Sequence, residues 1–201
     1  MTGWVMSYSR FPEGAQVRRL HFPGDLLAMP SIPMRHHAED IEALSDAVIS
    51  PFPKQLLAGL FKMPRLTAIM YMLAQAERIT AGDRLANIGR NSARGRLAYL
   101  LLDILHRLRS TDPSVTDTFY MHLTREQVGQ FSGITTVHAS RMWSTLVEEG
   151  FIRSNGHIVT ILDESGLVRL SHYRDLNSDF DHHWLKLAEM EVLPVGARLD
   201  H

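Results

Sequence analysis

The chain has 201 residues, of which 45% are hydrophobic, and a formal net charge of −1 at pH 7. This composition allows a packed core, and the near-neutral charge requires any nucleic-acid contact to use a locally basic face. The absence of cysteine excludes disulfides, thiolate zinc sites and cysteine nucleophiles. No apolar run approaches the roughly 20 residues of a membrane span, and no signal peptide is evident, so we expect a cytoplasmic protein.

The first third of the chain predicts short strands and turns. Alternating apolar and polar side chains predict strands over residues 4–11, 16–22 and 41–49. Turns are expected at 12–14 and 23–25, and a short helix at 54–60. Strands punctuated about every ten residues are typical of a sandwich or barrel, so residues 1–62 predict a β domain.

The middle of the chain predicts a long helix that begins at Pro64, a residue suited to the first helical position. Apolar residues then recur at steps of three and four: Leu66, Ile69, Met70, Leu73 and Ala76. The pattern continues for about 26 residues, or roughly 39 Å, until Gly89 interrupts it. A helix this long with an apolar seam usually pairs with another helix, so residues 63–90 predict a dimerisation helix and a homodimer.

Residues 91–173 predict a second domain. Asn91 or Ser92 can cap a helix that continues toward Leu108, and a polar loop follows at 110–117. The rest of the chain, residues 174–201, is a polar extension with a short amphipathic segment.

The sharpest functional signal begins at Leu123. Thr124, with Gln127 three residues later, predicts a capping box at the start of a short helix. Gly133 permits a tight turn, and Thr135 can cap a second helix over about 135–147. The first helix is expected to bury Val128, Phe131 and Ile134, and the second to turn inward Ala139, Met142 and Leu146. Two helices joined in this way predict a helix-turn-helix, although small helical cores with a surface arginine use the same arrangement.

A hairpin follows the two helices at once. Asn155-Gly156 between residues 151–154 and 157–161 is a strong hairpin signal. A last helix is expected to open near Asp163 and to end near Tyr173. Two helices and a hairpin wing are the parts of a winged helix-turn-helix that binds double-stranded DNA.

The second helix predicts the DNA contacts. Four residues are expected to face the bases in the major groove: Thr136, Val137, Ser140 and Arg141. Arg141 can bond bidentately to guanine, which discriminates by about 1–3 kcal/mol. Four residues are expected to contact phosphates: Thr124, Arg125, Thr135 and His138.

On these residues the chain resembles the CRP/FNR family of bacterial transcription regulators, over residues 3 to 173. Gly3, Gly14 and Pro23-Gly24-Asp25 are similar to strands of that family's cupin-like effector domain, and Ser140-Arg141 matches the Ser-Arg pair of the FNR branch. The resemblance implies an α+β fold with a partial cupin-like β-roll, a long dimerisation helix and a C-terminal winged helix-turn-helix. It also implies a homodimer that reads two half-sites about one helical turn apart and contacts RNA polymerase.

The recognition helix departs from the family pattern at two positions. Val137 stands where the family commonly has a glutamate, and Thr136 stands where the CRP branch has a further arginine. Methyl groups here would suit thymine, so the family's half-site sequence does not transfer.

The effector region departs further. Gly24-Asp25-Leu26 runs on without the Arg-Ser or Arg-Thr pair that holds a cyclic nucleotide, which argues against cyclic AMP. An FNR-type iron–sulfur cluster is excluded by the lack of cysteine, so no cofactor is predicted. Family members usually carry several dozen residues before the strand at Gly3. We therefore expect either a misplaced start at Met1 or an incomplete roll.

Other residues keep alternatives open. Seven arginines could flank phosphates or form a solvated face: Arg78, Arg84, Arg90, Arg94, Arg96, Arg107 and Arg109. His36-His37 could ligate a metal but is better explained as exposed loop, and the same holds for His182-His183 beside Asp179 and Asp181. The alternatives to a DNA-binding regulator are a dimeric interaction protein and a metal-dependent enzyme that uses this tail. No catalytic or metal-binding residue is predicted.

Overall fold

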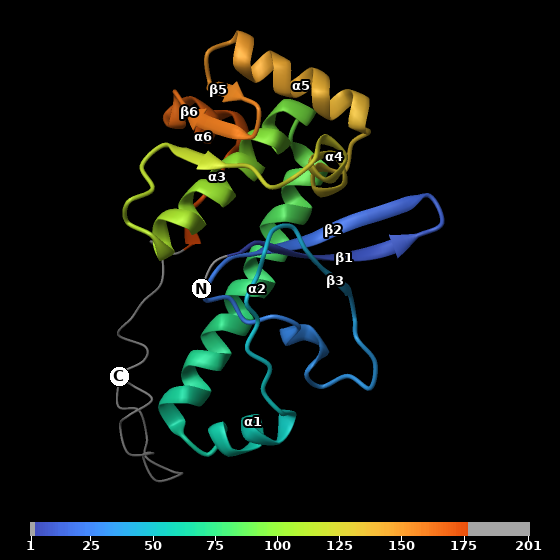
Figure 1. Ribbon diagram of the computed structural model, residues 1–201, viewed down its shortest axis with the longest axis vertical. Coiled ribbons are helices and arrows are strands. Elements are labelled where there is room, and N and C mark those ends of the chain that lie inside the picture. Colours follow the sequence, from blue (N-terminus) through green and yellow to red (C-terminus); the bar gives the residue numbers. More distant parts are fainter. Residues whose placement is uncertain (1–2, 177–201) are drawn as a thin grey trace, which may run out of the picture.

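The computed structural model describes residues 3–176, and the predictions for the tail beyond them lie outside these residues (Figure 1). The first sheet is antiparallel, with strand order β2-β1-β3: β1 Val5–Phe11, β2 Gly14–His21 and β3 Asp40–Ala43. Its register shifts by one residue between Ser7 and Tyr8. One 3-10 turn, Met29–Ser31, follows the 23–25 turn.

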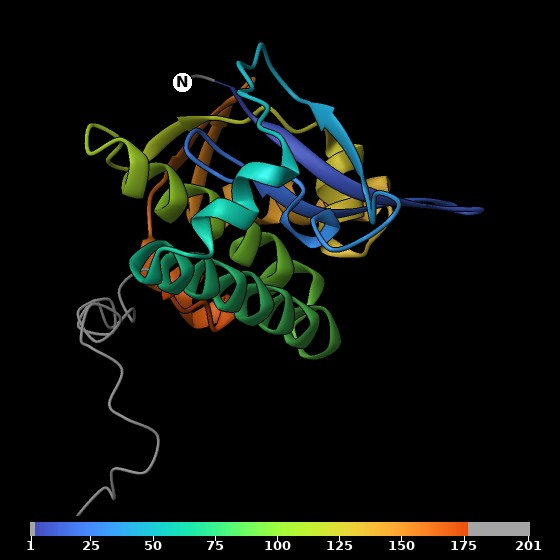
Figure 2. The same cartoon turned by 90° about the horizontal axis from the view of Figure 1, so that it is seen from below.

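Two helices follow the first sheet. Helix α1 (Lys54–Leu60) lies at one end of the molecule, and α2 (Pro64–Arg90) runs along most of its length (Figure 1). Seen from below, the first sheet lies to one side of α2 (Figure 2). The predicted start at Pro64 is confirmed, whereas the expected break at Gly89 is wrong, since α2 continues through it to Arg90.

The second part of the chain contains α3 (Ala93–Thr111), β4 (Thr118–Tyr120), α4 (Arg125–Ser132) and α5 (Thr136–Glu148), then β5 (Ile152–Asn155), β6 (Ile158–Ile161) and α6 (Glu164–Ser171). Ser92 caps α3 by accepting a hydrogen bond from the amide of Gly95 at 3.2 Å. The second sheet has the order β4-β6-β5, so β4, which alternation did not predict, pairs with the wing.

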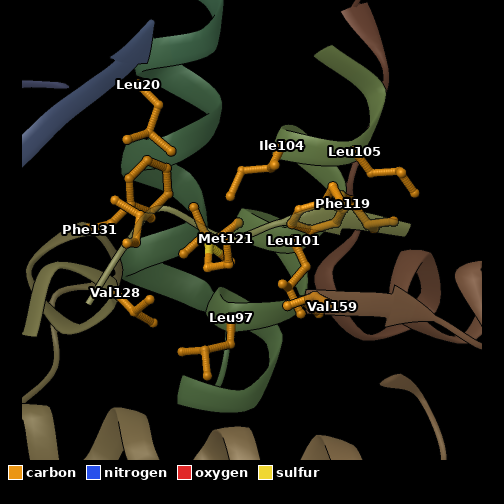
Figure 3. Packing of buried hydrophobic residues seen from close by; sticks show 14 of the residues in the cluster. Leu20, Leu97, Leu101, Ile104, Leu105, Phe119, Met121, Val128, Phe131 and Val159 are labelled. Atoms are coloured by element: carbon orange, nitrogen blue, oxygen red, sulfur yellow. The ribbon is translucent and has the colours of Figure 1, made fainter. Parts of the chain in front are cut away.

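One hydrophobic core joins the first sheet to the second part of the chain. Figure 3 shows Leu20 of β2 packed with α3, α4 and the second sheet. Leu97, Leu101 and Ile104 of α3 are fully buried at its centre. Trp4 lies against the ring of His122, with the centroids 5.0 Å apart. The first sheet is therefore packed directly on the helices that carry the helix-turn-helix.

The sheet differs from the predicted roll in extent. The strand expected over 41–49 ends at Ala43, so that prediction is wrong for its second half. Val5 is the first residue of β1 and pairs with Ala43, so β1 has no further residue with which the chain after Ala43 could pair. Trp4 donates its amide to the side-chain hydroxyl of Ser45 at 2.9 Å, where continued strand pairing would use a backbone carbonyl. The first sheet is open and three-stranded, which agrees with the partial roll that the resemblance implies.

No single helix among the described residues is long and apolar enough to cross a membrane. The pair α1 and α2, bent by 117° at the break between them, meets the length and composition test only when the two are joined.

Candidate nucleic-acid interface

Helix α4 begins with the predicted capping box. The Thr124 hydroxyl accepts from the amide of Gln127 at 3.2 Å, and the Gln127 side chain accepts from the Thr124 amide at 2.9 Å. Two amides without intrahelical partners are satisfied in this way. Val128 and Phe131 are buried below the helix, as predicted. The box and the two buried side chains fix where α4 begins and which face it turns inward.

Two glycines shape the turn that follows. Gly133 ends α4 in the left-handed region, with φ +64°, where a residue without Cβ is favoured. Gly129 was not predicted to matter, although a glycine inside a short helix marks a position where a side chain is not tolerated. A Cβ at Gly129 would lie 2.7 Å from the carbonyl oxygen of Ile134. The turn therefore approaches α4 as closely as its backbone allows.

Helix α5 turns a narrow apolar face inward. The Thr135 hydroxyl caps it by accepting from the His138 amide at 3.3 Å, as predicted. Ala139 and Leu146 are buried as expected, whereas Met142 is only half-buried. Trp143, which was not assigned to the core, is buried beside them. The three-residue spacing between Trp143 and Leu146 is the sequence pattern that indicates this buried position.

The four residues predicted to read bases all lie on the opposite face. Thr136, Val137, Ser140 and Arg141 are exposed, and Val137 is 72% exposed despite being apolar. Helix α5 lies at the outer edge of the molecule (Figure 1). The arrangement leaves a guanidinium, a hydroxyl pair and a bare methyl surface side by side on one helix.

The four residues predicted to contact phosphates divide into two groups. Thr124, Thr135 and His138 are exposed at the starts of α4 and α5. Both threonine hydroxyls act as acceptors in the caps, so their O–H groups can still donate to a phosphate oxygen. The guanidinium of Arg125 instead lies 3.6 Å from the centroid of the Trp143 ring, and burial lowers its pKa. Arg125 thus packs α4 against α5 in this structure.

The wing is the hairpin of β5 and β6. Gly156 takes φ +58° in its turn, as the Asn-Gly pair predicts, and Arg153 is exposed on β5. Tyr120 of β4 stacks on His157 at the turn, with the centroids 5.2 Å apart. His157 is hydrogen-bonded through Nδ1 to the carbonyl of Met121 at 3.0 Å. These contacts hold the wing against β4.

The predicted arginine cluster is largely engaged in contacts within the protein. Arg94 pairs with Glu149 at 2.5 Å, and Arg109 pairs with Glu164 at 2.9 Å. Arg84 is buried, so neither of the alternatives given for it, a phosphate contact or a solvated face, is correct. Arg78 and Arg90 remain exposed. Most of these arginines on α2 and α3 therefore make contacts within the protein instead of forming a basic surface.

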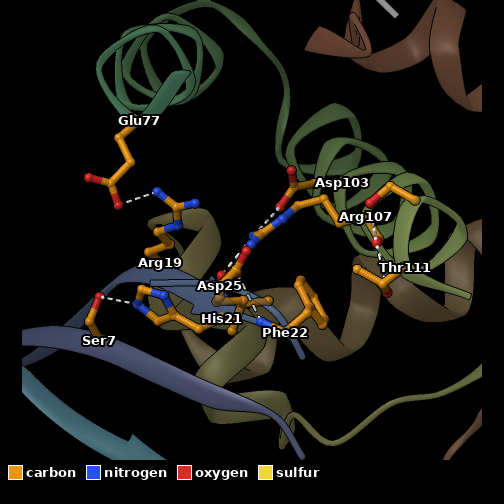
Figure 4. Close-up of polar contacts among 11 residues, drawn as sticks. Ser7, Arg19, His21, Phe22, Asp25, Glu77, Asp103, Arg107 and Thr111 are labelled. Carbon is orange, nitrogen blue, oxygen red and sulfur yellow. Dashed lines mark hydrogen bonds and ion pairs between the residues drawn. The ribbon is translucent and has the colours of Figure 1, made fainter. Parts of the chain in front are cut away.

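Arg107 ties α3 to the first sheet (Figure 4). Its guanidinium donates to the carbonyl of Leu20 at 2.7 Å and pairs with the carboxylate of Asp25. It also lies 4.5 Å from the centroid of the Phe22 ring. Burial raises the pKa of the neighbouring Asp103, which lies 3.9 Å from Arg107. The 23–25 turn is thus held on the helix that begins the second part of the chain.

The described residues contain no group of three or more histidine, cysteine, aspartate or glutamate side chains placed to hold a metal. His36 and His37 are exposed in a loop. His182 and His183, with Asp179 and Asp181, lie outside residues 3–176.

A capped helix pair with a left-handed glycine turn, an exposed polar face on the second helix and a wing at its end defines a winged helix-turn-helix protein. Residues 95–170 match the family model of the Crp-like helix-turn-helix domain. The chain is 27% identical over 172 residues to the anaerobic regulatory protein of Haemophilus influenzae, covering 85% of this chain and 66% of that protein. It is 26% identical to the fumarate and nitrate reduction regulatory protein of Escherichia coli, covering 87% and 71%.

Solved structures share the fold. FixK2 from Bradyrhizobium japonicum superposes with a TM-score of 0.75 at 23% identity, over 87% of this chain and 86% of that chain. A CRP-family transcriptional regulator of Thermus thermophilus superposes with a TM-score of 0.69 at 17% identity, over 86% and 85%. Residues 95–170 thus form a Crp-like helix-turn-helix domain, and over most of its length the chain is similar to CRP/FNR-family transcription regulators. Both of the relatives named above are regulatory proteins and neither is an enzyme, which agrees with the prediction of a regulator.

Proposed function

We propose that this protein is a sequence-specific DNA-binding regulator whose helix α5 lies in the major groove. The observation that carries the proposal is the exposed face of α5, which presents Thr136, Val137, Ser140 and Arg141 on a helix capped at its start. The first turns of a recognition helix are where base edges are met. The hydroxyls of Thr124 and Thr135, with His138, would hold the phosphates on either side.

Each exposed side chain suits a particular base edge. Arg141 can donate two hydrogen bonds to O6 and N7 of guanine, and Ser140 can donate to or accept from several edges. Val137, at 72% exposure, has only methyl groups to offer, and these fit the methyl group of thymine. The half-site should therefore contain a guanine and at least one thymine.

We further propose that two copies pair through α2. Two large apolar side chains, Tyr71 at 55% and Leu85 at 73%, are exposed in the single chain, and fourteen positions at 100° per residue place them within about 40° of each other on the helix. An apolar seam on a 27-residue helix gains most by burying itself against the same seam of a second copy. Two copies would place two α5 helices on half-sites about one turn of DNA, roughly 34 Å, apart.

A cavity beside the first sheet is the proposed effector site. It has a volume of about 420 Å³ and lies between the 21–32 segment, residues 47–52 and α1. Its lining is mostly apolar, and His21, which is only 3% exposed, contributes to it. A small apolar molecule fits such a lining. The regulator would act in the cytoplasm and would signal to RNA polymerase.

Replacing Arg141 by alanine tests the proposal. A duplex selected by the wild-type protein should bind the Arg141→Ala variant about 10–100-fold more weakly, because the bidentate contact to guanine is lost. Arg65→Ala is the matched control, since Arg65 is exposed in the first turn of α2, and that end of α2 lies at the opposite end of the molecule from α5 (Figure 1). Its affinity should equal that of the wild type.

Two results would contradict the proposal. If Arg141→Ala bound the duplex as tightly as the wild type, α5 would not be the helix that reads the bases. A wild-type protein that dimerises but selects no DNA sequence would instead favour an interaction protein.

A further inference from the structure

We infer that Arg84 is a positioning residue for the recognition helix, an inference that rests on the proposed function. Arg84 lies on α2, outside residues 95–170 that match the Crp-like domain. Its guanidinium nevertheless reaches the last turn of α4, the helix that leads into α5. The position of α5 thus depends on a side chain from the proposed dimerisation helix.

The end of α4 is where this dependence arises. The last carbonyls of a helix have no partner within it and must be satisfied from elsewhere. Here four successive carbonyls accept from side chains of three other elements. Gln16 of β2 donates to Gln130, Arg84 of α2 donates to Phe131, and Arg96 of α3 donates to Ser132 and Gly133.

Arg84 makes the most extensive of these contacts. Its Nη2 donates to the carbonyl of Phe131 at 2.9 Å, and its Cζ lies 3.7 Å from the centroid of the Phe131 ring. The same guanidinium donates to the carbonyls of Val17 and Arg18 on β2. One rigid, planar group therefore joins α2, β2 and α4, and its fork fixes the spacing of the three backbones.

Burial makes the arrangement demanding. Arg84 is 8% exposed, and burial lowers its pKa to about 10, so it stays charged at neutral pH. Among residues 3–176 its hydrogen bonds are to backbone carbonyls, with no carboxylate at ion-pair distance. A buried charge is strongly destabilising once its partners leave. Any movement of the sheet or α2 away from α4 would therefore break bonds that this charge requires.

The consequence for DNA reading follows from chain order. Phe131 precedes the Gly133 turn by two residues, and the Thr135 cap of α5 comes two residues after that turn. A shift of Phe131 is carried directly into the orientation of α5. Arg96 holds α4 within its own domain and Gln16 ties it to the sheet, whereas Arg84 makes its position sensitive to α2 as well as to the sheet.

The test compares specific with non-specific binding. The dissociation constants of a selected operator and of a scrambled duplex are measured at one salt concentration, together with the oligomeric state and thermal unfolding. Arg84→Met keeps the apolar part of the side chain and removes the guanidinium. Arg84→Lys keeps the positive charge and removes the planar set of N–H donors. Arg65→Met is the matched control, with the same substitution at an exposed position of α2.

A positioning role predicts a selective loss. Operator affinity of Arg84→Met should fall about tenfold or more, whereas affinity for the scrambled duplex should stay within about twofold, because non-specific binding depends on phosphates alone. Arg84→Lys should lie between Arg84→Met and the wild type. The control should match the wild type in both affinities.

Two outcomes would overturn the inference. One is an unchanged ratio of operator to scrambled affinity in both Arg84 variants. The other is an equal fall of both affinities that follows the melting temperature, which indicates stability alone. If Arg84→Met does not fold, the same ratio in Arg84→Lys decides. A wild-type protein with no operator preference would overturn the proposed function itself, and with it this inference.

Discussion

At the scale of single residues, the missing side chain of Gly129 sets how closely the turn approaches α4. A Cβ there would meet the backbone oxygen of Ile134 at 2.7 Å, and backbone cannot move aside as a flexible side chain can. Gly129→Ala should therefore lower the free energy of unfolding by about 1–3 kcal/mol and weaken operator binding, since α5 must shift. Urea unfolding and DNA titration measure the two effects.

A matched control is available in α1. Gly59 is also helical, and a Cβ there would meet nothing within 4 Å. Gly59→Ala should be neutral or stabilise by about 0.5–1 kcal/mol, because alanine loses less backbone entropy. A Gly129→Ala variant as stable as Gly59→Ala would show that the turn is looser than described.

His21 predicts a pH dependence of stability. Burial, followed by the charge of Arg19, lowers its pKa in the folded chain from 6.5 to about 4. The Nε2 atom is hydrogen-bonded to Ser7 at 3.2 Å, and Nδ1 has no partner among the described residues. Asp25 and Arg107 also face the ring from neighbouring elements, and they oppose each other in their effect on this pKa.

The unfolded chain takes up a proton at His21 near pH 6.5, whereas the folded chain does so only near pH 4. Stability from this residue is therefore full above pH 6.5 and is lost as the pH falls toward 4, by an amount on the order of 2–3 kcal/mol. His21→Leu should lose that much less stability than the wild type between pH 7 and pH 4.5, measured by urea unfolding. Parallel pH profiles of the two proteins would refute the prediction.

At the scale of elements, α2 has an exposed apolar seam that a second copy would cover. Leu85 is 73% exposed, and a charge there would be buried against the partner copy. Leu85→Glu should shift the protein to monomer in sedimentation and leave its helical circular dichroism unchanged. Arg65→Glu is the control, since twenty positions at 100° per residue place it roughly opposite Leu85 on the helix. A Leu85→Glu dimer would exclude α2 as the interface.

The local elements were predictable because their signals are local. The capping box of Thr124 and Gln127, the Gly133 turn and the Asn-Gly wing each depend on residues within a few positions of one another. The exposed face of α5 followed from the same helical periodicity, and the structure leaves all four predicted base-reading residues exposed. Whether they read bases stays a prediction.

Contacts between distant segments were not predictable. Arg84 was assigned to a surface cluster because its carbonyl partners lie 47, 66 and 67 positions away, and backbone acceptors leave no sequence signal. The predicted strand continued too far beyond Ala43, because alternation of apolar and polar residues does not show where a partner strand begins. Trp143 was missed on α5, since the apolar face was assigned to Met142 instead.

At the scale of the whole molecule, the first sheet and the helix-turn-helix behave as one packed body. Leu20 and Phe22 share a core with α3, and Arg107 and Arg84 add polar ties at either end of that contact. A cavity beside the same sheet gives an effector a place from which to act. Binding there could alter DNA affinity only by favouring one arrangement of sheet and helices over another.

Selection of binding sites from random duplexes by the full chain tests the central claim most directly. The account predicts an inverted repeat whose half-site centres lie about 10 base pairs apart, with a guanine in each half that Arg141→Ala no longer selects. Selection of no motif, or of a single unrepeated half-site that Arg141→Ala selects equally well, would contradict it.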